Sequence, residues 1–273
     1  RSQKSGVRTR QLPGVSPLVF SRFLLEKTAF LSLSDMGKAL PSYEEIPIAC
    51  RMEEVVQTEY KRIEDALVRV LRSDRRVAQK ILSAYLNLLT VYPDQPYDQK
   101  PILYPDSDIP IVKPESIGDA DCLGEKELRT LEIVKAAIQN GERALIYTSW
   151  VRTDSQQKIK RFLTDEGYRT EILTDKIKTT DREDWVQKKL AAGMQVLIVN
   201  PSLVETGLDL NAFTTLVFYS MGYKLFTLRQ ASRRSWRINQ KAPAVKVYML
   251  YYEDTMQQKC LKLMASQMAK ELT

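Results

Sequence analysis

The feature that most constrains the fold is an alternation of short apolar runs with amphipathic segments, which continues from about residue 124 to the C-terminus. Strands that alternate with helices in this way form βαβ units, and their parallel sheets are covered on both faces. The sequence therefore predicts an α/β domain with a parallel sheet and helices on both sides. The runs expected as strands are Arg143–Ser149, Arg169–Thr174, Gln195–Asn200, Thr214–Ser220 and Ala244–Tyr252. The segments expected as helices are Gly124–Asn140, Asp154–Glu166, Thr180–Ala192, a basic segment before residue 240, and Thr255–Leu272.

The N-terminal part of the chain follows a different pattern. Four prolines interrupt residues 1–50, which predicts irregular structure around one helix near Pro17–Lys27. Apolar residues at helical spacing then predict two helices, from Met52 to Leu71 and from Val77 to Leu89, packed as a hairpin with Ser73-Asp74 as the N-cap of the second. Six prolines in residues 92–118 predict an exposed linker that wraps over the surface. We expect a helical, Pro-rich region at 1–118 and the α/β domain at 119–273.

The composition excludes several kinds of chemistry. The chain contains no histidine, so it cannot form a Ser-His-Asp triad, a Cys-His pair or a histidine-ligated zinc site. Its three cysteines, Cys50, Cys122 and Cys260, lie far apart and are expected to be free thiols. There is no apolar run long enough for a membrane span and no export signal at the first residues. The start at Arg1, without Met, leads us to expect a piece of a longer protein.

Positive charge is concentrated in one window. The net charge is +7, and no acidic residue occurs between Asp209 and Glu253. The basic residues of this window are Lys224, Arg229, Arg233, Arg234, Arg237, Lys241 and Lys246, whose seven charges equal the net charge of the chain. Such a local field favours polyanions such as nucleic acid or nucleotide phosphates. A solvated, Arg-rich helix face would produce the same pattern, so charge alone leaves both interpretations open.

Polar loops follow several of the predicted strands. A polar turn follows Ser149, the sequence PSLVETGLDL follows Asn200, and the basic segment ending RQASRRSWRINQ follows Ser220. Ligands of parallel sheets collect at the carboxyl ends of the strands. Hydroxyls, backbone amides, a carboxylate and guanidinium groups are the groups that hold a nucleotide and neutralise phosphoryl charge. The pattern therefore predicts a phosphate-handling site at this edge.

These motifs resemble a known family. A strand ending in Thr-Ser, then TGLDL, then Q-x-x-x-R-x-x-R resembles motifs IV, V and VI of superfamily-two helicases, and QASRRSWRINQ followed by APAVKVYML is similar to the SWI/SNF-type helicase-like ATPases. The stretches FLSLSDMGKALPSYEEIPIACRM, LNLLTVYPDQPY and LGEKELRTLEIVKAAIQNGERALIYTSW resemble the segments that join the two lobes and enter the second, in the same order. The resemblance implies a RecA-like second, C-terminal lobe, preceded by the helical region that joins the lobes.

The resemblance also implies a role for individual residues. Arg234 and Arg237 match the arginine fingers that act on the γ-phosphate, and three apart on a helix they would share one face. The residues implied to bind ATP are Gly207, Asp209 and Gln230, and those implied to bind nucleic acid are Thr148, Ser149 and Thr206. Trp236 stands where the family commonly has His, and we expect it to pack rather than to stack on a base. Together with Arg233 and Asn239, which also depart from the family pattern, it favours a bacterial or phage branch and a cytoplasmic location.

Two expected motifs are missing. The sequence contains no G-x-x-x-x-G-K-[ST] and no Asp-Glu pair for Mg²⁺ after an apolar strand. The resemblance then implies half of an ATP-dependent DNA helicase or translocase, with an N-terminal lobe of the same parent chain supplying the remaining ATP and Mg²⁺ contacts. We expect the fragment alone to be inactive and its partner to be double-stranded DNA, with RNA left open. The alternative is a non-enzymatic, basic nucleic-acid-binding or scaffold module that kept a degenerate motor fold.

Overall fold

The structure is a computed structural model, and it describes residues 22–23, 41–149, 155–204, 208–220, 234–236, 240 and 242–271. Leu40–Thr273 form one compact unit, distinct from residues 1–39. The helix expected near Pro17–Lys27 lies almost wholly outside the described residues. The larger unit contains every strand and α-helix that the structure describes.

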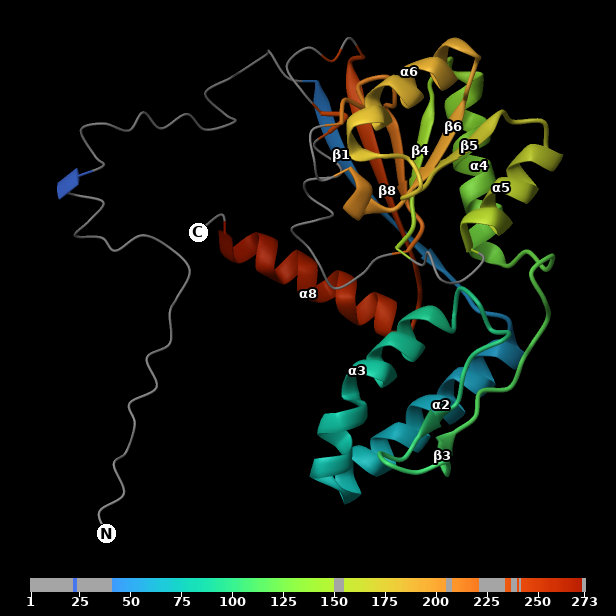
Figure 1. Cartoon of the computed structure of the whole chain (residues 1–273), viewed down its shortest axis with the longest axis vertical. Helices are drawn as coiled ribbons and strands as arrows, with labels where there is room; N and C mark the ends of the chain where they lie inside the picture. Colours follow the sequence, from blue (N-terminus) through green and yellow to red (C-terminus); the bar gives the residue numbers. More distant parts are fainter. Residues whose placement is uncertain are drawn as a thin grey trace. The chain divides into compact units, whose positions relative to one another are not determined.

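This unit is built on a six-stranded sheet in which every pair of neighbouring strands is parallel. Its order is β1-β8-β7-β4-β6-β5 (Figure 1). The strands are β1 (Ser42–Cys50), β4 (Ala144–Tyr147), β5 (Thr170–Leu173), β6 (Val196–Val199), β7 (Thr215–Phe218) and β8 (Ala244–Tyr252). The five strands from β4 onward lie within the predicted apolar runs. The prediction of an α/β parallel sheet is therefore confirmed.

The sixth strand, β1, corrects the expectation of irregular structure before residue 50. It pairs with β8 over its whole length, from Ser42 beside Ala244 to Cys50 beside Tyr252. The N–H of Ser42 donates to Pro243 at the start and the carbonyl of Cys50 accepts at the end, so the even-numbered residues of β1 bond to β8. Pro47 is odd-numbered, and its missing N–H falls on the free edge, where proline is tolerated in a sheet. A proline within the run thus concealed an edge strand.

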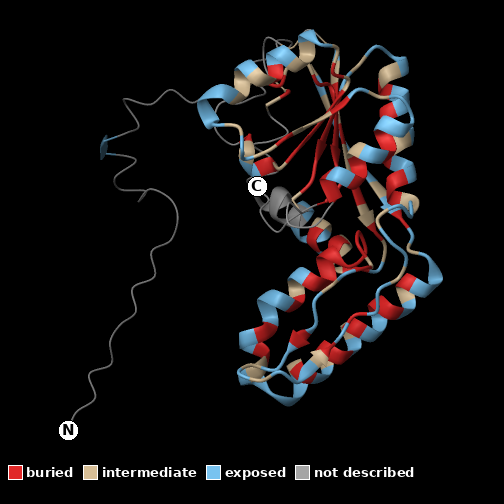
Figure 2. Cartoon of the chain, turned by 45° about the vertical axis from the view of Figure 1, so that its right-hand side comes forward, coloured by how far each residue is buried: buried red, intermediate tan, exposed pale blue. Residues whose placement is uncertain are grey.

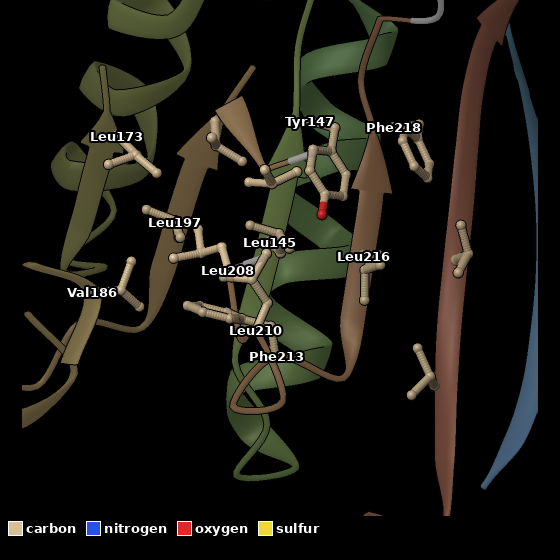
Figure 3. Close-up of a cluster of buried hydrophobic side chains, with 14 of the residues drawn as sticks. Leu145, Tyr147, Leu173, Val186, Leu197, Leu208, Leu210, Phe213, Leu216 and Phe218 are labelled. Atoms are coloured by element: carbon tan, nitrogen blue, oxygen red, sulfur yellow. The ribbon is translucent and has the colours of Figure 1, made fainter. Parts of the chain in front are cut away.

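Helices cover both faces of the sheet, as the sequence predicts. They are α4 (Glu125–Gln139) and α5 (Ser155–Asp165) on one face and α6 (Arg182–Ala191) on the other. The last helix, α8 (Met256–Glu271), follows β8 and lies beside α3, to which Gln257 bonds through the Thr90 carbonyl (Figure 1). Because side chains alternate along a strand, Leu145 and Tyr147 of β4 join the cluster on the α6 side, shown in Figure 3. Ile146 points to the opposite face and packs with Val134 of α4 and Ile159 of α5. In Figure 2 the strands are mostly buried, whereas the outer faces of the helices are exposed.

The predicted helical hairpin is also confirmed. It consists of α2 (Glu54–Ser73) and α3 (Arg75–Val91), which pack along a shared apolar cluster. Asp74 is the N-cap of α3, because its carboxylate accepts hydrogen bonds from the N–H groups of Arg76 at 2.9 Å and Val77 at 3.1 Å.

Residues 92–118 are not an exposed linker throughout, and this part of the prediction is wrong. The short strands β2 (Ile102–Leu103) and β3 (Pro110–Val112) pair antiparallel, and Ile102 and Val112 are buried in the cluster of the hairpin. The buried phenol of Tyr92 donates to the Glu115 carbonyl at 3.0 Å. The apolar residues between the prolines have no regular spacing, so only the hairpin surface against which they pack shows that they are buried.

A network of buried charges connects this region to the sheet. The wholly buried ammonium of Lys126 in α4 donates to the carboxylate of Asp94 at 2.6 Å and to the amide oxygen of Gln257 in α8 at 2.9 Å. Next to it, Glu127 accepts from Lys158 of α5 and from the Tyr219 hydroxyl, both at 2.7 Å. Two positive and two negative groups thus balance one another. The predicted domain boundary at 118/119 stays a prediction, and the Lys126–Asp94 pair crosses it.

Two further expectations concern the described part of the chain. None of its helices is long and apolar enough to cross a membrane. The three cysteines are free, as predicted, with Cys122 exposed and the other two buried. Burial raises the pKa of the Cys50 thiol to about 11, so this sulfur is held in its protonated form at neutral pH.

Candidate functional site

Polar side chains connect the carboxyl ends of three neighbouring strands. Thr148, after β4, and Ser220, after β7, share a hydrogen bond of 3.0 Å between their hydroxyls. The same Ser220 oxygen accepts the N–H of Ser149 at 2.8 Å. The amide of Asn200, which follows β6, lies 3.5 Å from the Ser149 carbonyl, and its oxygen accepts the N–H of Ser202 at 2.9 Å. The carboxyl edge of β4, β6 and β7 is therefore an ordered polar surface.

Within this surface, the two residues expected to contact nucleic acid differ in accessibility. Thr148 is fully buried, and its hydroxyl is already shared with Ser220. Ser149 is half-buried, so it is the member of the pair that reaches the surface. Ser220 and Asn200 were not predicted as contributors. Both are the last residues of predicted strands, and a search for polar residues at strand ends would have found them.

Asp209 lies in a loop that α6 holds in place. Its N–H donates to the carboxylate of Glu183 at 2.9 Å. Its own carboxylate accepts the backbone N–H of Asn211 at 3.1 Å and the side-chain amide at 3.3 Å, and the residue is half-buried. The carboxylate is thus fixed in direction while part of the residue stays accessible. The neighbouring candidates, Thr206 and Gly207, lie outside the described residues.

Arg234 lies at a turn. The sequence predicts a helix through this basic segment, but the described residues Arg234 and Ser235 form a turn and Trp236 has no regular structure. The prediction of a helix is thus wrong for residues 234–236, and the prediction that Arg234 and Arg237 share one face stays a prediction. Arg237 and Gln230 lie outside the described residues, and the roles of all three stay predictions.

Hydrogen bonds fix this turn against the Asp209 loop. The buried hydroxyl of Ser235 donates to the Leu210 carbonyl at 3.1 Å. The amide of Gln240 donates to the carbonyls of Asn211 and Ser235, each at 2.9 Å. Backbone carbonyls of the loop are thus bound by side chains of the turn. Gln240 was noted only as the glutamine that ends QASRRSWRINQ, and Ser235 was not singled out, because a serine in a polar loop has no distinctive spacing.

Arg234 also interacts with the end of β4. Burial raises the pKa of the Tyr147 phenol, and the guanidinium of Arg234 opposes this shift by lowering it. Tyr147, labelled in Figure 3, stacks on Phe218 of β7 and immediately precedes Thr148. The centroids of the two rings are 4.8 Å apart. The Arg234 guanidinium therefore acts near the end of β4, while its turn bonds to the Asp209 loop on the α6 side of the sheet. The hydroxyls of Thr148 and Ser220 lie at the carboxyl ends of the strands, whereas the turn also reaches Pro41, at the amino end of β1.

Trp236 packs, as expected, and it also makes a hydrogen bond. Its indole N–H donates to the Pro41 carbonyl at 2.8 Å, and its ring lies 4.9 Å from that of Tyr43 at an interplanar angle of 39°. Both partners belong to the segment that enters and begins β1. The edge strand is thereby attached to the turn that carries Arg234.

The described part of this edge does not form a metal site. Over the described ranges, no group of three or more Cys, Asp or Glu side chains is placed to hold a metal ion. Asp209 is directed at Asn211, so this part of the chain does not provide a set of Mg²⁺ ligands. The expectation that such ligands belong to another lobe stays a prediction.

Comparison with known proteins gives a family match over the central part of the chain. Residues 126–239 match the family described as "Helicase conserved C-terminal domain". The match begins in α4 and extends past Arg234. No curated protein sequence matches the chain. The family match confirms the resemblance to the superfamily-two helicase C-terminal lobe, while the bacterial or phage branch stays a prediction.

Several solved structures of ATPase domains have the same fold. The C-terminal part of the Fun30 ATPase domain has a TM-score of 0.63 at 14% identity, covering 82% of this chain and 90% of that one. The Sulfolobus solfataricus SWI2/SNF2 ATPase C-terminal domain has a TM-score of 0.58 at 18% identity, covering 82% and 86%. The Sulfolobus solfataricus SWI2/SNF2 ATPase core in complex with dsDNA has a TM-score of 0.59 at 20% identity, covering 82% of this chain and 44% of that one. The RecA-like fold expected from the motifs is thus confirmed.

Proposed function

We propose, from the helicase conserved C-terminal domain at residues 126–239, that this chain is the C-terminal motor lobe of an ATP-dependent DNA translocase or helicase. An N-terminal lobe of the same parent chain would complete its ATPase site. The observation that carries the proposal is the position of Arg234. Its turn is bound to the Asp209 loop on the α6 side of the sheet, and its guanidinium acts electrostatically on Tyr147 at the end of β4.

In this proposal ATP lies between the two lobes, and this lobe contributes charge and orientation. The guanidinium groups of Arg234 and Arg237 neutralise the negative charge that develops on the transferred γ-phosphoryl group. Asp209 and Gly207 approach the ribose and phosphates, and Gln230 contributes from the same basic motif. Mg²⁺, held by the other lobe, would supply further positive charge to the phosphates. Because the P-loop also belongs to that lobe, the chain alone is expected not to hydrolyse ATP.

The nucleic-acid partner proposed is double-stranded DNA. The solved SWI2/SNF2 core with the same fold is in complex with dsDNA, which supports this choice. Ser149 and Thr206 would hydrogen-bond to backbone phosphates, contacts that position a protein without reading sequence. Thr148 would act by holding Ser220, whose oxygen accepts the Ser149 N–H at 2.8 Å. Closure of the lobes on ATP and reopening after hydrolysis would move them along the DNA backbone.

The test is Arg234→Ala in the intact parent protein. A guanidinium that acts on transition-state charge affects kcat far more than ATP affinity. We therefore expect DNA-stimulated kcat to fall about 10³-fold, the scale of arginine fingers, with a much smaller change in KM for ATP. Arg234→Lys should not restore turnover, because an ammonium lacks the planar fork. Phosphate release at saturating duplex DNA measures both constants.

The control is Arg229→Ala, which removes an equal charge from the same basic window but off the motif spacing. It should leave turnover nearly unchanged. Equal losses in the two variants would identify a general basic surface and contradict the motif assignment. Absence of DNA-stimulated turnover in the unmodified parent protein would favour the non-enzymatic scaffold instead.

A further inference from the structure

We propose that Trp236 is a positioning residue for Arg234, which it holds in place by attaching the arginine-bearing turn to the start of β1. The proposal rests on the proposed function, since it concerns how the Arg234 guanidinium is aimed. Such a role would explain an indole hydrogen bond that joins residues 195 positions apart. Two segments of the chain hold the turn: the Asp209 loop, through Ser235 and Gln240, and the residues that begin β1, through Trp236.

One side of the turn is fixed by the Asp209 loop. Ser235 donates to the Leu210 carbonyl at 3.1 Å, and Gln240 donates to the Asn211 carbonyl at 2.9 Å. These bonds hold the turn against the Asp209 loop, on the α6 side of the sheet. The Ser235 bond acts on the residue that follows Arg234, so the backbone can still rotate about this attachment.

The other side is fixed by Trp236. Its N–H donates to Pro41 at 2.8 Å, and its ring lies against Tyr43. With attachments at Ser235 and Trp236, the two residues that follow Arg234 are bound to different segments of the chain. Two such attachments restrict the rotation that one would allow. The direction of the Arg234 side chain is then set by both.

The Pro41 carbonyl, which accepts the Trp236 N–H, is itself held in place. Pro41 immediately precedes β1, and the N–H of Ser42 donates to the Pro243 carbonyl at 2.9 Å, where β1 begins to pair with β8. The pairing continues through all nine residues of the strand. The position of the Pro41 carbonyl is therefore fixed by the pairing of β1 with β8. A displacement of the segment entering β1 would be transmitted to the turn through one hydrogen bond and one ring contact.

A purely packing role for Trp236 makes a different prediction. Trp236 is partly buried and contacts the apolar cluster on the α6 side of the sheet. If packing were its whole role, phenylalanine would replace it at modest cost in stability, and catalytic constants per folded molecule would not change. If it positions Arg234, loss of the N–H alone should lower turnover. Trp236→Phe separates the two, because it keeps an aromatic ring near Tyr43 and removes the donor.

The experiment compares Trp236→Phe, Arg234→Ala and Tyr43→Phe in the intact parent protein. We measure kcat and KM for ATP at saturating duplex DNA, the dissociation constant for DNA, and the fraction folded. We expect Trp236→Phe to lower kcat per folded molecule about tenfold, with little change in KM or DNA affinity, since a catalytic group misplaced by about 1 Å can cost up to about 100-fold. Tyr43→Phe keeps the ring against Trp236 and removes a hydroxyl that bonds to Glu45 at 3.1 Å and acts electrostatically on Tyr147, so it should lower kcat much less than Trp236→Phe.

The outcomes distinguish this inference from the proposed function. If Arg234→Ala abolishes turnover while Trp236→Phe leaves kcat unchanged, the positioning role is overturned and the proposed function stands. A loss of turnover in Trp236→Phe that merely follows its unfolded fraction also overturns the positioning role. If Arg234→Ala itself retains full turnover, the proposed function fails, and the inference fails with it.

Discussion

The side chain of Lys126, including its charged ammonium group, is fully buried. Two oxygens and two aromatic rings surround it, with the centroids of Tyr219 and Tyr252 at 5.2 Å and 5.0 Å from the nitrogen. Burial raises the pKa of its partner Asp94, and Lys126 opposes that shift. One oxygen of Asp94 has no hydrogen-bond partner among the described residues, so the ammonium is the main compensation for this buried carboxylate.

We predict that Lys126→Met destabilises the chain by about 3–5 kcal/mol, the usual cost of leaving one member of a buried pair uncompensated. An acid whose pKa is raised in the folded state binds its proton more tightly when folded, so lower pH stabilises the fold. The loss should therefore be smaller at about pH 5 than at about pH 8. Urea denaturation at the two pH values measures both effects.

Two further variants serve as its controls. Asp94→Asn combined with Lys126→Met should recover part of the stability, because no unpaired charge remains. Lys80→Met breaks the Lys80–Asp106 pair, whose side chains are 61% and 87% exposed, and should change stability little. A loss in Lys80→Met as large as in Lys126→Met would show that burial is not the cause.

At the scale of elements, the hairpin of α2 and α3 depends on a sharp reversal at Asp74. Its carboxylate satisfies two of the N–H groups that a helix start leaves without partners. We predict that Asp74→Ala destabilises the chain by about 1 kcal/mol. Asp65→Ala, an exposed substitution within α2, makes the control and should be close to neutral. Thermal and urea unfolding measure both. Equal effects in the two variants would contradict the capping role.

The same scale shows where sequence patterns sufficed and where they did not. The strands from β4 to β8 alternate with helices, and the central strands β4, β6 and β7 are buried on both faces, so local composition identifies them. Strand β1 alternates Ile46 and Ile48 with exposed residues and contains Pro47, a pattern that is typical of a loop as well as of an edge strand. Its assignment depends on β8, a partner near the other end of the chain, as the Ser42–Ala244 register shows.

At the scale of the whole molecule, the net charge of +7 predicts electrostatic binding to DNA. We expect binding to duplex DNA to be independent of sequence and to weaken steeply with salt, because each phosphate contact releases counterions. Titration of two labelled duplexes of unrelated sequence, at several salt concentrations, measures the slope and the preference. A flat salt response or a marked preference for one duplex would contradict backbone binding by this lobe.

The sequence by itself determined the class of fold and the chemistry available to it. The period of the apolar residues, the absence of histidine and the order of the motifs act locally along the chain, so they can be detected without knowing which segments meet. The tertiary structure alone decided that Ser42–Cys50 is a strand, that residues 92–118 are partly buried, and that Ser235, Gln240 and Trp236 hold the turn of Arg234 from two sides. Each of these depends on a partner far away in the sequence, and a hydrogen bond or an apolar contact leaves no periodic signal at either end.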